Sequence, residues 1–378
     1  MKKAFWCITV IVLLAFFYDK FKTDAFTLDK MVCELNAQAR KDLFADYYDQ
    51  AASLLEKLSL DEKISQLLLV RYPKENAIEI LREYQFGGYL LFAENFANKT
   101  YEEVKKMTNE IQENAKIPLL IASDEEGGKV SRISINPNLV EAPFKSASEL
   151  YDLGGFSKIA EDTLLKSAIL FDLGINLNLA PVIDVSTDEN DYIYERTLKK
   201  NTRLTSIYAQ TVINASKKTG VSYTLKHFPG YGNNKDTHKG YALDKRPFEM
   251  IVQNDLPPFV AGINAGAEAV MISHNIVTSI DENNPASVSI LVHDLLINEL
   301  KFSGITITDD ITMKALDNIS NADIKAIQAG NNIIITTDYQ KSFSTIKKAV
   351  LENVILEEEI NNLALKVLAW KYYKGLLK

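Results

Sequence analysis

Short apolar runs recur along most of the chain, and longer segments with helical periodicity separate them. Each run is dominated by Val, Ile, Leu or aromatic residues. The runs are 88–92, 118–123, 175–182, 221–227, 269–274, 304–309 and 332–336, with an eighth expected around 67–70. Strands that are apolar along their whole length are typical of a parallel sheet covered on both faces. The pattern therefore predicts an α/β fold, a (β/α)8 TIM-type barrel with an N-terminal helical extension.

Polar side chains lie where these predicted strands end. They are Asp124, Asp184, Lys226, His227, His274 and Asp309. The carboxyl ends of parallel strands meet at one rim of a barrel, and barrel enzymes build their active sites at that rim. We therefore expect these side chains to share one site.

Length and charge limit the classes of partner. A chain of 378 residues, 47% of them hydrophobic, has room for one main domain with appendages. Acidic residues outnumber basic ones by 50 to 42, which argues against a nucleic-acid partner. The sequence contains no phosphate loop, dinucleotide fingerprint or metal-ligand spacing, so we expect neither a cofactor nor a metal.

The first residues have the pattern of an export signal. Lys2 and Lys3 precede an apolar run over 4–18, which charged residues then end. The run is shorter than a typical spanning helix, and no clear cleavage site follows it. A cleaved signal peptide and an uncleaved membrane anchor both stay open. We expect an exported protein, either periplasmic or anchored to the outer face of the inner membrane.

The chain divides into three expected parts. Residues 1–27 form the signal peptide or anchor, 28–57 an adaptor helix, and 58–378 the catalytic barrel. Ser59 and Glu62 have the spacing of a capping box, which predicts that a helix begins near Leu60. Cys7 lies in the leader, so Cys33 would remain alone and could form no internal disulfide.

The segment 226–238, with the sequence KHFPGYGNNKDTH, is the most informative. Two glycines and a proline shape a loop, while lysine, aspartate and histidine supply hydrogen-bonding and titratable groups. Two of the four histidines of the chain, His227 and His238, lie in it. An isolated histidine is usually a packed side chain, but this clustering favours a function.

Two further segments carry carboxylates at strand ends. In 305–313, ITITDDITM, four β-branched residues lead into Asp309 and Asp310. In 124–132, DEEGGKVSR, paired glycines follow Asp124 and let the backbone approach a ligand closely. For Asp309 alone the alternative is a helix cap, and for Asp310 a cap or a supporting acceptor is the favoured interpretation.

These segments resemble the bacterial family 3 β-N-acetylhexosaminidases, a family of glycoside hydrolases. The matching motifs are Lys-His-Phe-Pro-Gly-x-Gly with an Asp-x-His dyad, Thr-Asp, Asp-x-Glu-Gly-Gly-x-Val-x-Arg, a strand-end histidine at His274 and Pro-Ala-x-x-Ser at 285–289. They stand in the order of the family over about 58–340.

The resemblance implies a retaining hydrolase that removes terminal β-linked N-acetylglucosamine from peptidoglycan-derived glycans. Asp309 would be the nucleophile, and Asp236 with His238 the acid/base dyad. The expected substrate-binding residues are Asp124, Arg132, Arg196, Lys226 and His227. An ordinary salt bridge is the alternative for Arg196, and a loop brace is the expected role of Glu126.

Two departures from the family pattern leave other functions open. Tyr231 stands where the family usually has His or Arg, and the span from Lys226 to the dyad is one residue shorter. The alternatives are a family 3 β-glucosidase, a β-N-acetylglucosaminide phosphorylase and a non-catalytic glycan-binding barrel. The aglycone and the oligomeric state do not follow from the sequence.

Overall fold

The computed structural model describes residues 42–234, 236–237, 240 and 242–378. The predicted leader 1–27 and the part of the adaptor segment before Asp42 lie outside these residues. Within the described chain, no helix is long and apolar enough to cross a membrane.

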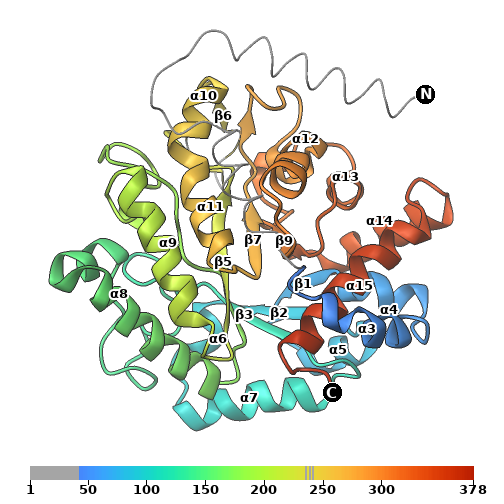
Figure 1. Ribbon diagram of the computed structural model, residues 1–378. Helices are drawn as coiled ribbons and strands as arrows, with labels where there is room; N and C mark the ends of the chain where they lie inside the picture. The colour runs from blue at the N-terminus through green and yellow to red at the C-terminus, as the bar shows by residue number, and fades with distance from the viewer. Residues whose placement is uncertain (1–41, 235, 238–239, 241) are drawn as a thin grey trace.

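The described strands form an eight-stranded parallel sheet in the order β10-β1-β2-β3-β4-β5-β7-β9 (Figure 1). The strands are β1 (Leu68–Arg71), β2 (Gly88–Leu91), β3 (Leu120–Ser123), β4 (Leu177–Asn178), β5 (Ser222–Phe228), β7 (Ala269–Ile272), β9 (Ile305–Thr308) and β10 (Ile334–Thr336). A parallel bridge between Ile307 and Ile333 joins the two edges, so the sheet closes almost completely into a barrel. The predicted (β/α)8 barrel is confirmed, and each predicted apolar run overlaps one of these strands.

Helices separate the strands and surround the barrel (Figure 1). They are α3 (Tyr48–Leu55), α4 (Leu60–Gln66), α5 (Ala77–Tyr84), α6 (Ala93–Phe96), α7 (Tyr101–Glu113), α8 (Ala147–Asp172), α9 (Thr202–Ser216), α10 (Phe248–Met250), α11 (Leu256–Asn264), α12 (Ile290–Asp294), α13 (Ala322–Ala329), α14 (Tyr339–Leu351) and α15 (Glu357–Tyr373). Short 3₁₀ or π turns are η1 (Ala45–Tyr47), η2 (Tyr194–Arg196), η3 (Ile251–Asp255), η4 (Ala286–Val288), η5 (Leu295–Glu299) and η6 (Lys314–Leu316).

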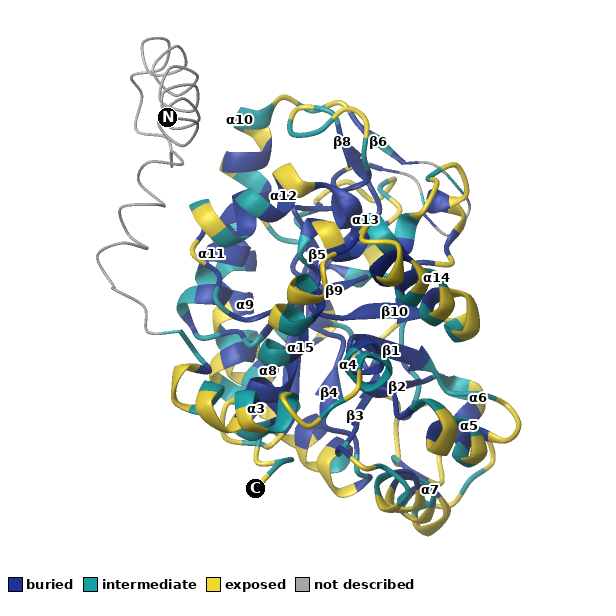
Figure 2. Cartoon of the chain, turned by 90° about the vertical axis from the view of Figure 1, so that its right-hand side faces the viewer, coloured by how far each residue is buried: buried dark blue, intermediate teal, exposed yellow. Residues whose placement is uncertain are grey.

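The residues of β2, β3, β5, β7, β9 and β10 are all buried, which explains why these strands read as unbroken apolar runs. Figure 2 shows buried strands in dark blue inside the molecule and exposed residues in yellow on the outer sides of helices such as α7. A second small sheet pairs β6 (Leu243–Asp244) with β8 (Ile276–Val277). It was not predicted, because two residues are too short to show a periodicity.

Helix α4 begins where its capping signal predicts. The Glu62 backbone N–H donates to Ser59 Oγ at 3.3 Å, and the Ser59 N–H donates to Glu62 Oε2 at 3.0 Å. This confirms the capping box at the entry to the barrel. Helix α3, the described end of the predicted adaptor segment, packs against α15, which also packs against α4 (Figure 1). The boundary at residue 57 stays a prediction.

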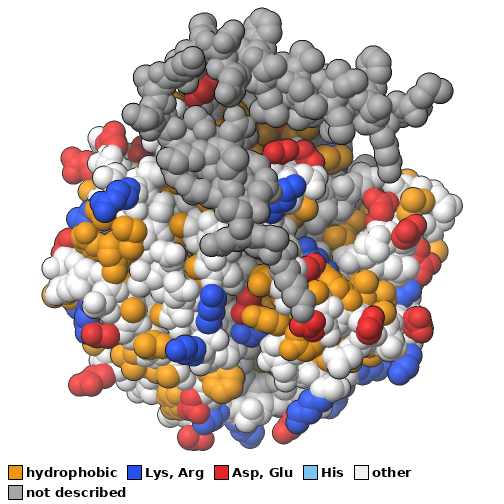
Figure 3. All heavy atoms as spheres, viewed as in Figure 1, with side chains coloured by type: hydrophobic (Ala, Val, Ile, Leu, Met, Phe, Trp, Pro, Cys, Tyr) orange, Lys and Arg blue, Asp and Glu red, His pale blue; other side chains and the backbone are white. Residues whose placement is uncertain are grey.

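The charged side chains of the described surface are mixed in sign. On the face shown in Figure 3, blue and red groups are interspersed over the visible described atoms.

Candidate active site

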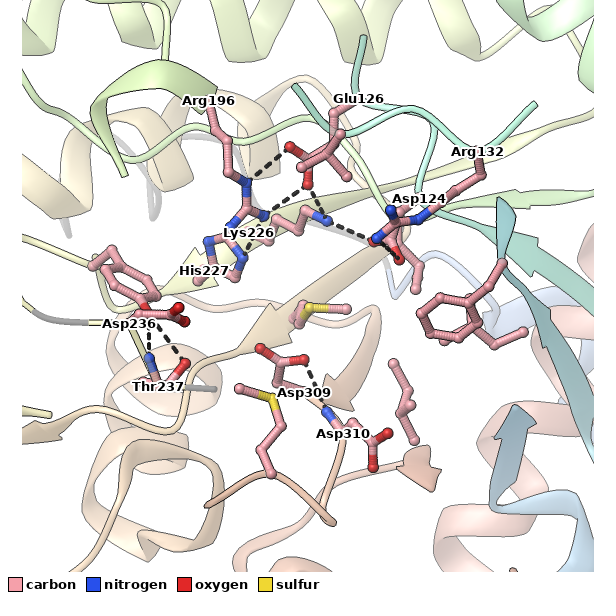
Figure 4. A pocket seen from close by; sticks show the side chains of 18 of the residues that line it. Asp124, Glu126, Arg132, Arg196, Lys226, His227, Asp236, Thr237, Asp309 and Asp310 are labelled. Atoms are coloured by element: carbon pink, nitrogen blue, oxygen red, sulfur yellow. Dashed lines mark hydrogen bonds and ion pairs between the residues drawn. The ribbon is translucent and has the colours of Figure 1, made fainter. Parts of the chain in front are cut away.

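A pocket of about 420 Å³ opens at the carboxyl ends of the barrel strands. Its lining includes the described residues proposed for catalysis and sugar binding: Asp124, Arg132, Arg196, Lys226, His227, Asp236 and Asp309 (Figure 4). Asp184 and His274, which we also expected at this site, do not line the pocket. The remaining candidate, His238, lies outside the described residues. Segments that are far apart in the chain thus converge on one cavity, as expected for a barrel enzyme.

Lys226, on β5, is the centre of one wall of the pocket. Its side chain is 2% exposed, and its Nζ lies 2.8 Å from Asp124 Oδ1 and 2.7 Å from Glu126 Oε1. Burial by itself would lower the pKa of Lys226, but the charges of Asp124 and Glu126 outweigh it and raise that pKa. The lysine is therefore held as a cation between two carboxylates.

Glu126 connects this lysine to Arg196, which belongs to η2. Arg196 Nε donates to Glu126 Oε2 at 3.0 Å, and Arg196 Nη2 donates to Oε1 at 2.7 Å (Figure 4). Burial opposes ionisation of Glu126, but the charges of Arg196 and Lys226 hold its pKa well below the usual range. Glu126 thus ties the two cations of the wall together, a larger role than the loop brace that we expected. The salt bridge considered for Arg196 exists, and Arg196 also lines the pocket.

His227 continues the network behind Arg196. Its Nδ1 lies 2.7 Å from Asp184 Oδ2, and its Nε2 lies 3.2 Å from Arg196 Nη2. Because a guanidinium can only donate, His227 Nε2 accepts from Arg196, and Nδ1 then donates to Asp184. His227 therefore holds Arg196 in place through one neutral tautomer of its ring.

Asp184, which we noted only as a strand-end carboxylate, accepts three hydrogen bonds. The donors are the His227 ring, the His227 backbone N–H at 3.2 Å and the Tyr231 backbone N–H at 2.7 Å. Asp184 thus connects the network to the loop that follows β5. From the sequence we named Asp184 for its position just after the run 175–182 but assigned it no role.

Asp309 follows β9 on the other side of the pocket (Figure 4). Its Oδ1 accepts the Asp310 N–H at 2.8 Å, and its own N–H donates to the Ile272 carbonyl oxygen at 3.1 Å. These bonds orient the carboxylate relative to the ends of β7 and β9.

Asp310 is engaged with its own turn. It accepts from the Thr312 N–H at 2.9 Å and hydroxyl at 2.7 Å, and from the Thr337 hydroxyl at 2.7 Å. This agrees with the cap interpretation, although a turn and η6 follow in place of a long helix. Buried His274 bonds Ser287 Oγ at 2.7 Å and the Asp310 carbonyl oxygen at 2.9 Å, so it supports the same turn.

The loop after β5 brings Asp236 and Thr237 to the pocket (Figure 4). Tyr192 lines the same pocket as Asp236 and Arg196, and the charges of both act on its phenol. Sequence reasoning did not identify Tyr192, since a tyrosine in an irregular segment carries no pattern. In the part of the chain that the structure describes, no group of three or more His, Cys, Asp or Glu side chains could hold a metal ion.

Comparison with known proteins identifies relatives of this chain. A β-hexosaminidase of Xanthomonas campestris is 33% identical over 233 residues, which are 61% of this chain and 69% of the relative. A β-hexosaminidase of Nitrosomonas eutropha is 28% identical over 296 residues, 74% of this chain and 84% of the relative.

Two solved structures have the same fold. A family 3 β-N-acetylglucosaminidase from Paenibacillus has a TM-score of 0.78 and 27% identity, over 84% of this chain and 63% of that chain. This chain therefore spans less than two thirds of the Paenibacillus protein. A family 3 glycosyl hydrolase from Mycobacterium smegmatis has a TM-score of 0.74 and 25% identity, over 84% and 98% of the two chains.

The sequence pattern described as "Glycosyl hydrolase family 3 N terminal domain" matches residues 59–369. The match begins at the N-cap of α4 and ends inside α15, so it contains the whole barrel. The chain belongs to glycosyl hydrolase family 3.

Proposed function

We propose that this chain is a retaining β-N-acetylhexosaminidase that removes terminal β-linked N-acetylglucosamine. The names of the relatives support the substrate class. The observation that carries the proposal is that Asp309 and Asp236 line the same pocket as the paired charges around Lys226. A nucleophile, one member of an acid/base dyad and a polar binding wall thus surround one cavity.

In this proposal the wall around Lys226 binds the sugar. An ammonium has three donors and a carboxylate about four acceptor positions, so Lys226 and Asp124 keep hydrogen-bonding capacity after pairing with each other. Arg132 Nη2 lies 3.9 Å from Asp124 Oδ2 and adds a further donor group. Because these groups already hold one another, little ordering is needed when a sugar binds.

The reaction has two steps. In the first, Asp309 attacks the anomeric carbon and the bond to the leaving oxygen breaks while His238 gives that oxygen a proton. In the second, His238 takes a proton from water, and the resulting oxygen attacks the same carbon and releases Asp309. Asp236 orients His238 and stabilises its protonated form. Two inversions leave the configuration retained.

We further propose a peptidoglycan-derived glycan as the natural substrate. Arg71, Phe92 and Arg132 line the same pocket. The Cζ atoms of Arg71 and Arg132 lie 4.3 and 5.5 Å from the Phe92 ring centroid. An aromatic ring with two guanidinium groups close to it fits an aglycone sugar that carries a carboxylate, as an N-acetylmuramic acid unit does.

The decisive experiment is Asp309→Asn with an aryl N-acetyl-β-glucosaminide. We expect kcat to fall by about 10⁴-fold or more, since the covalent step is lost. Asp310→Asn is the matched control, because it makes the same change in a neighbouring carboxylate that is engaged with its turn. Wild-type turnover in Asp309→Asn would end the proposal. A slow 5-fluoro glycosyl fluoride should label the peptide that contains Asp309 in the wild-type chain.

Parallel assays separate the alternatives. Preference for an aryl glucoside would make the chain a β-glucosidase, and phosphate-dependent release of a sugar phosphate would make it a phosphorylase. Glycan binding by pure protein without any turnover would indicate a non-catalytic barrel.

We also propose that the chain works outside the cytoplasm, in the periplasm or at the outer face of the inner membrane. The support is the apolar run 4–18 behind two lysines. Fractionation of cells that express the full chain, compared with a form that lacks residues 1–27, tests this. Cytoplasmic recovery of the full chain would contradict it.

A further inference from the structure

We propose that Tyr231 is a positioning residue whose phenol holds the Asp236-bearing segment against the sugar-binding wall. This inference rests on the proposed function, because it assigns Asp236 to the reaction. Tyr231 stands at one of the two departures from the family pattern, and its contacts give that departure a physical role.

The main chain of Tyr231 is held from several sides. Its N–H donates to Asp184 Oδ1 at 2.7 Å, and the other oxygen of Asp184 binds the His227 ring at 2.7 Å. The Tyr231 carbonyl oxygen accepts from Asn234 Nδ2 at 2.9 Å and from Asn275 Nδ2 at 3.2 Å. The residue is thus attached directly to the network that fixes Arg196.

The side chain of Tyr231 reaches forward along the loop to Thr237. Its oxygen accepts the Thr237 backbone N–H at 3.0 Å and lies 3.0 Å from Thr237 Oγ1. Tyr231 is 2% exposed and Thr237 1% exposed, so neither group can replace these bonds with bulk water. The phenol therefore bridges two residues six positions apart and fixes both polar groups of Thr237.

Packing on the ring restricts the phenol further. The Tyr231 ring centroid lies 5.7 Å from that of Tyr192 and 5.5 Å from that of His227. Tyr192 itself lines the pocket with Asp236 and Arg196, and both charges act on its phenol. Asp236 precedes Thr237 directly, so a displaced Thr237 backbone moves the dyad carboxylate relative to the pocket.

Other residues hold the start of the loop. Gly230 and Gly232 have φ values of 132° and 59°, and a Cβ at either position would clash with Asp255 or Arg246. Arg246 Nη1 and Asp255 Oδ2 pair at 2.9 Å. That ion pair supports the glycines at the start of the loop, whereas the Tyr231 phenol reaches the Thr237 backbone at the dyad end.

The test compares Tyr231→Phe with the wild-type chain on two N-acetyl-β-glucosaminides. One has a 2,4-dinitrophenyl leaving group, which departs without protonation, and the other an alkyl leaving group, which needs an acid. We expect kcat/KM for the alkyl substrate to fall by about 10- to 100-fold, a part of the roughly 10²- to 10⁴-fold that general acid catalysis contributes. We expect kcat/KM for the dinitrophenyl substrate to fall less than about threefold, because this constant reports the first step, in which that leaving group needs no proton.

Variants of Thr237 test the contact from its other side. Thr237→Ser keeps both polar groups and should behave like the wild-type chain. Thr237→Val keeps the N–H but loses the hydroxyl, so its loss on the alkyl substrate should lie between those of Thr237→Ser and Tyr231→Phe.

Tyr89→Phe is the matched control. It removes another buried phenol, which donates to the Ala77 carbonyl oxygen at 2.8 Å from β2. We expect Tyr89→Phe to lower stability without changing the ratio of the two kcat/KM values. Hydrogen exchange in peptides that contain Thr237 should become faster in Tyr231→Phe but not in Tyr89→Phe.

The outcomes separate this inference from the proposed function. Absence of wild-type hydrolysis on both substrates would end the proposed function. With an active wild-type chain, equal losses on the two substrates in Tyr231→Phe, or unchanged exchange at Thr237, would overturn the positioning role alone.

Discussion

Two buried lysines at opposite ends of the barrel differ in their partners. Lys226, at the rim where the strands end, lies between the carboxylates of Asp124 and Glu126. Lys371, on α15, lies at the end where the strands begin, and its Nζ donates to Gln66 Oε1 at 2.7 Å. The two side chains are 2% and 0% exposed, so burial is nearly the same.

Their ionisation nevertheless shifts in opposite directions. Burial lowers the pKa of Lys371 to about 7, whereas the two carboxylates raise the pKa of Lys226 against the effect of burial. A neutral amide oxygen solvates an ammonium but does not compensate its charge. The pocket rim therefore keeps a fixed cation for binding, while the opposite end holds a lysine that loses its proton near neutral pH.

The largest expected effect comes from removing the cation at the rim. In Lys226→Met, Asp124 and Glu126 lose a partner in a buried site, so we expect a loss of about 3–5 kcal/mol in the free energy of unfolding. We expect kcat/KM to fall by roughly 10³-fold, equivalent to about 4 kcal/mol, because the binding wall loses its centre. Urea denaturation and steady-state kinetics measure both.

Lys200→Met is the control for this change. Its ammonium lies 3.3 Å from Asp152 Oδ1 and is 30% exposed, so we expect at most about 1 kcal/mol. Equal losses of unfolding free energy in Lys226→Met and Lys200→Met would mean that burial does not make one ion pair matter more than the other.

A smaller effect should follow Glu126→Gln. This change keeps the shape but removes the negative charge between Lys226 and Arg196, and we expect a loss of about 1–3 kcal/mol near neutral pH. Because the folded pKa of Glu126 lies below its unfolded value of 4.5, its contribution is present above that value and is lost as the pH falls through the folded pKa. The stability difference between wild type and variant should therefore shrink from pH 6 to pH 3. A constant difference would contradict this.

Lys371→Met tests the opposite end of the barrel. The folded pKa of about 7 lies below the unfolded value of 10.5, so the unfolded chain binds more protons between these values. Wild-type stability should consequently rise with pH above 7, by roughly 2 kcal/mol between pH 6 and 8.5 from this group. The variant should lack that rise and keep its kcat. Lys348→Met, on the surface of α14, should keep the wild-type rise. An unchanged rise in Lys371→Met would show that Lys371 is not its cause.

The smallest effect concerns α4, which carries Gln66. Ser59→Ala removes the N-cap of this helix, and we expect a loss of about 1 kcal/mol with unchanged kcat. Ser59→Gly should cost only a few tenths of that amount. Thermal unfolding compares the two, and a change in kcat in either would show that this end of the barrel is coupled to the pocket.

Sequence patterns predicted most of the fold and part of the site. Buried parallel strands are apolar along their length, so all eight were visible as runs, and the Ser59 capping box marked the start of α4. Asp124, Lys226 and Asp309 were identifiable because they stand directly at strand ends. The sequence did not reveal Tyr192, the central role of Glu126 or the partner of Lys371. The neighbours of these three residues come from distant segments of the chain.

The amino-acid sequence alone determined local features: periodicity, helix capping, strand ends and the motifs that mark glycosyl hydrolase family 3. Whether a buried lysine is a permanent cation was decided only when the chain folded. Lys226 meets Asp124 from 102 residues away, and Lys371 meets Gln66 from 305 residues away. Ionisation depends on the charges within a few ångströms, and the barrel alone brings those charges together.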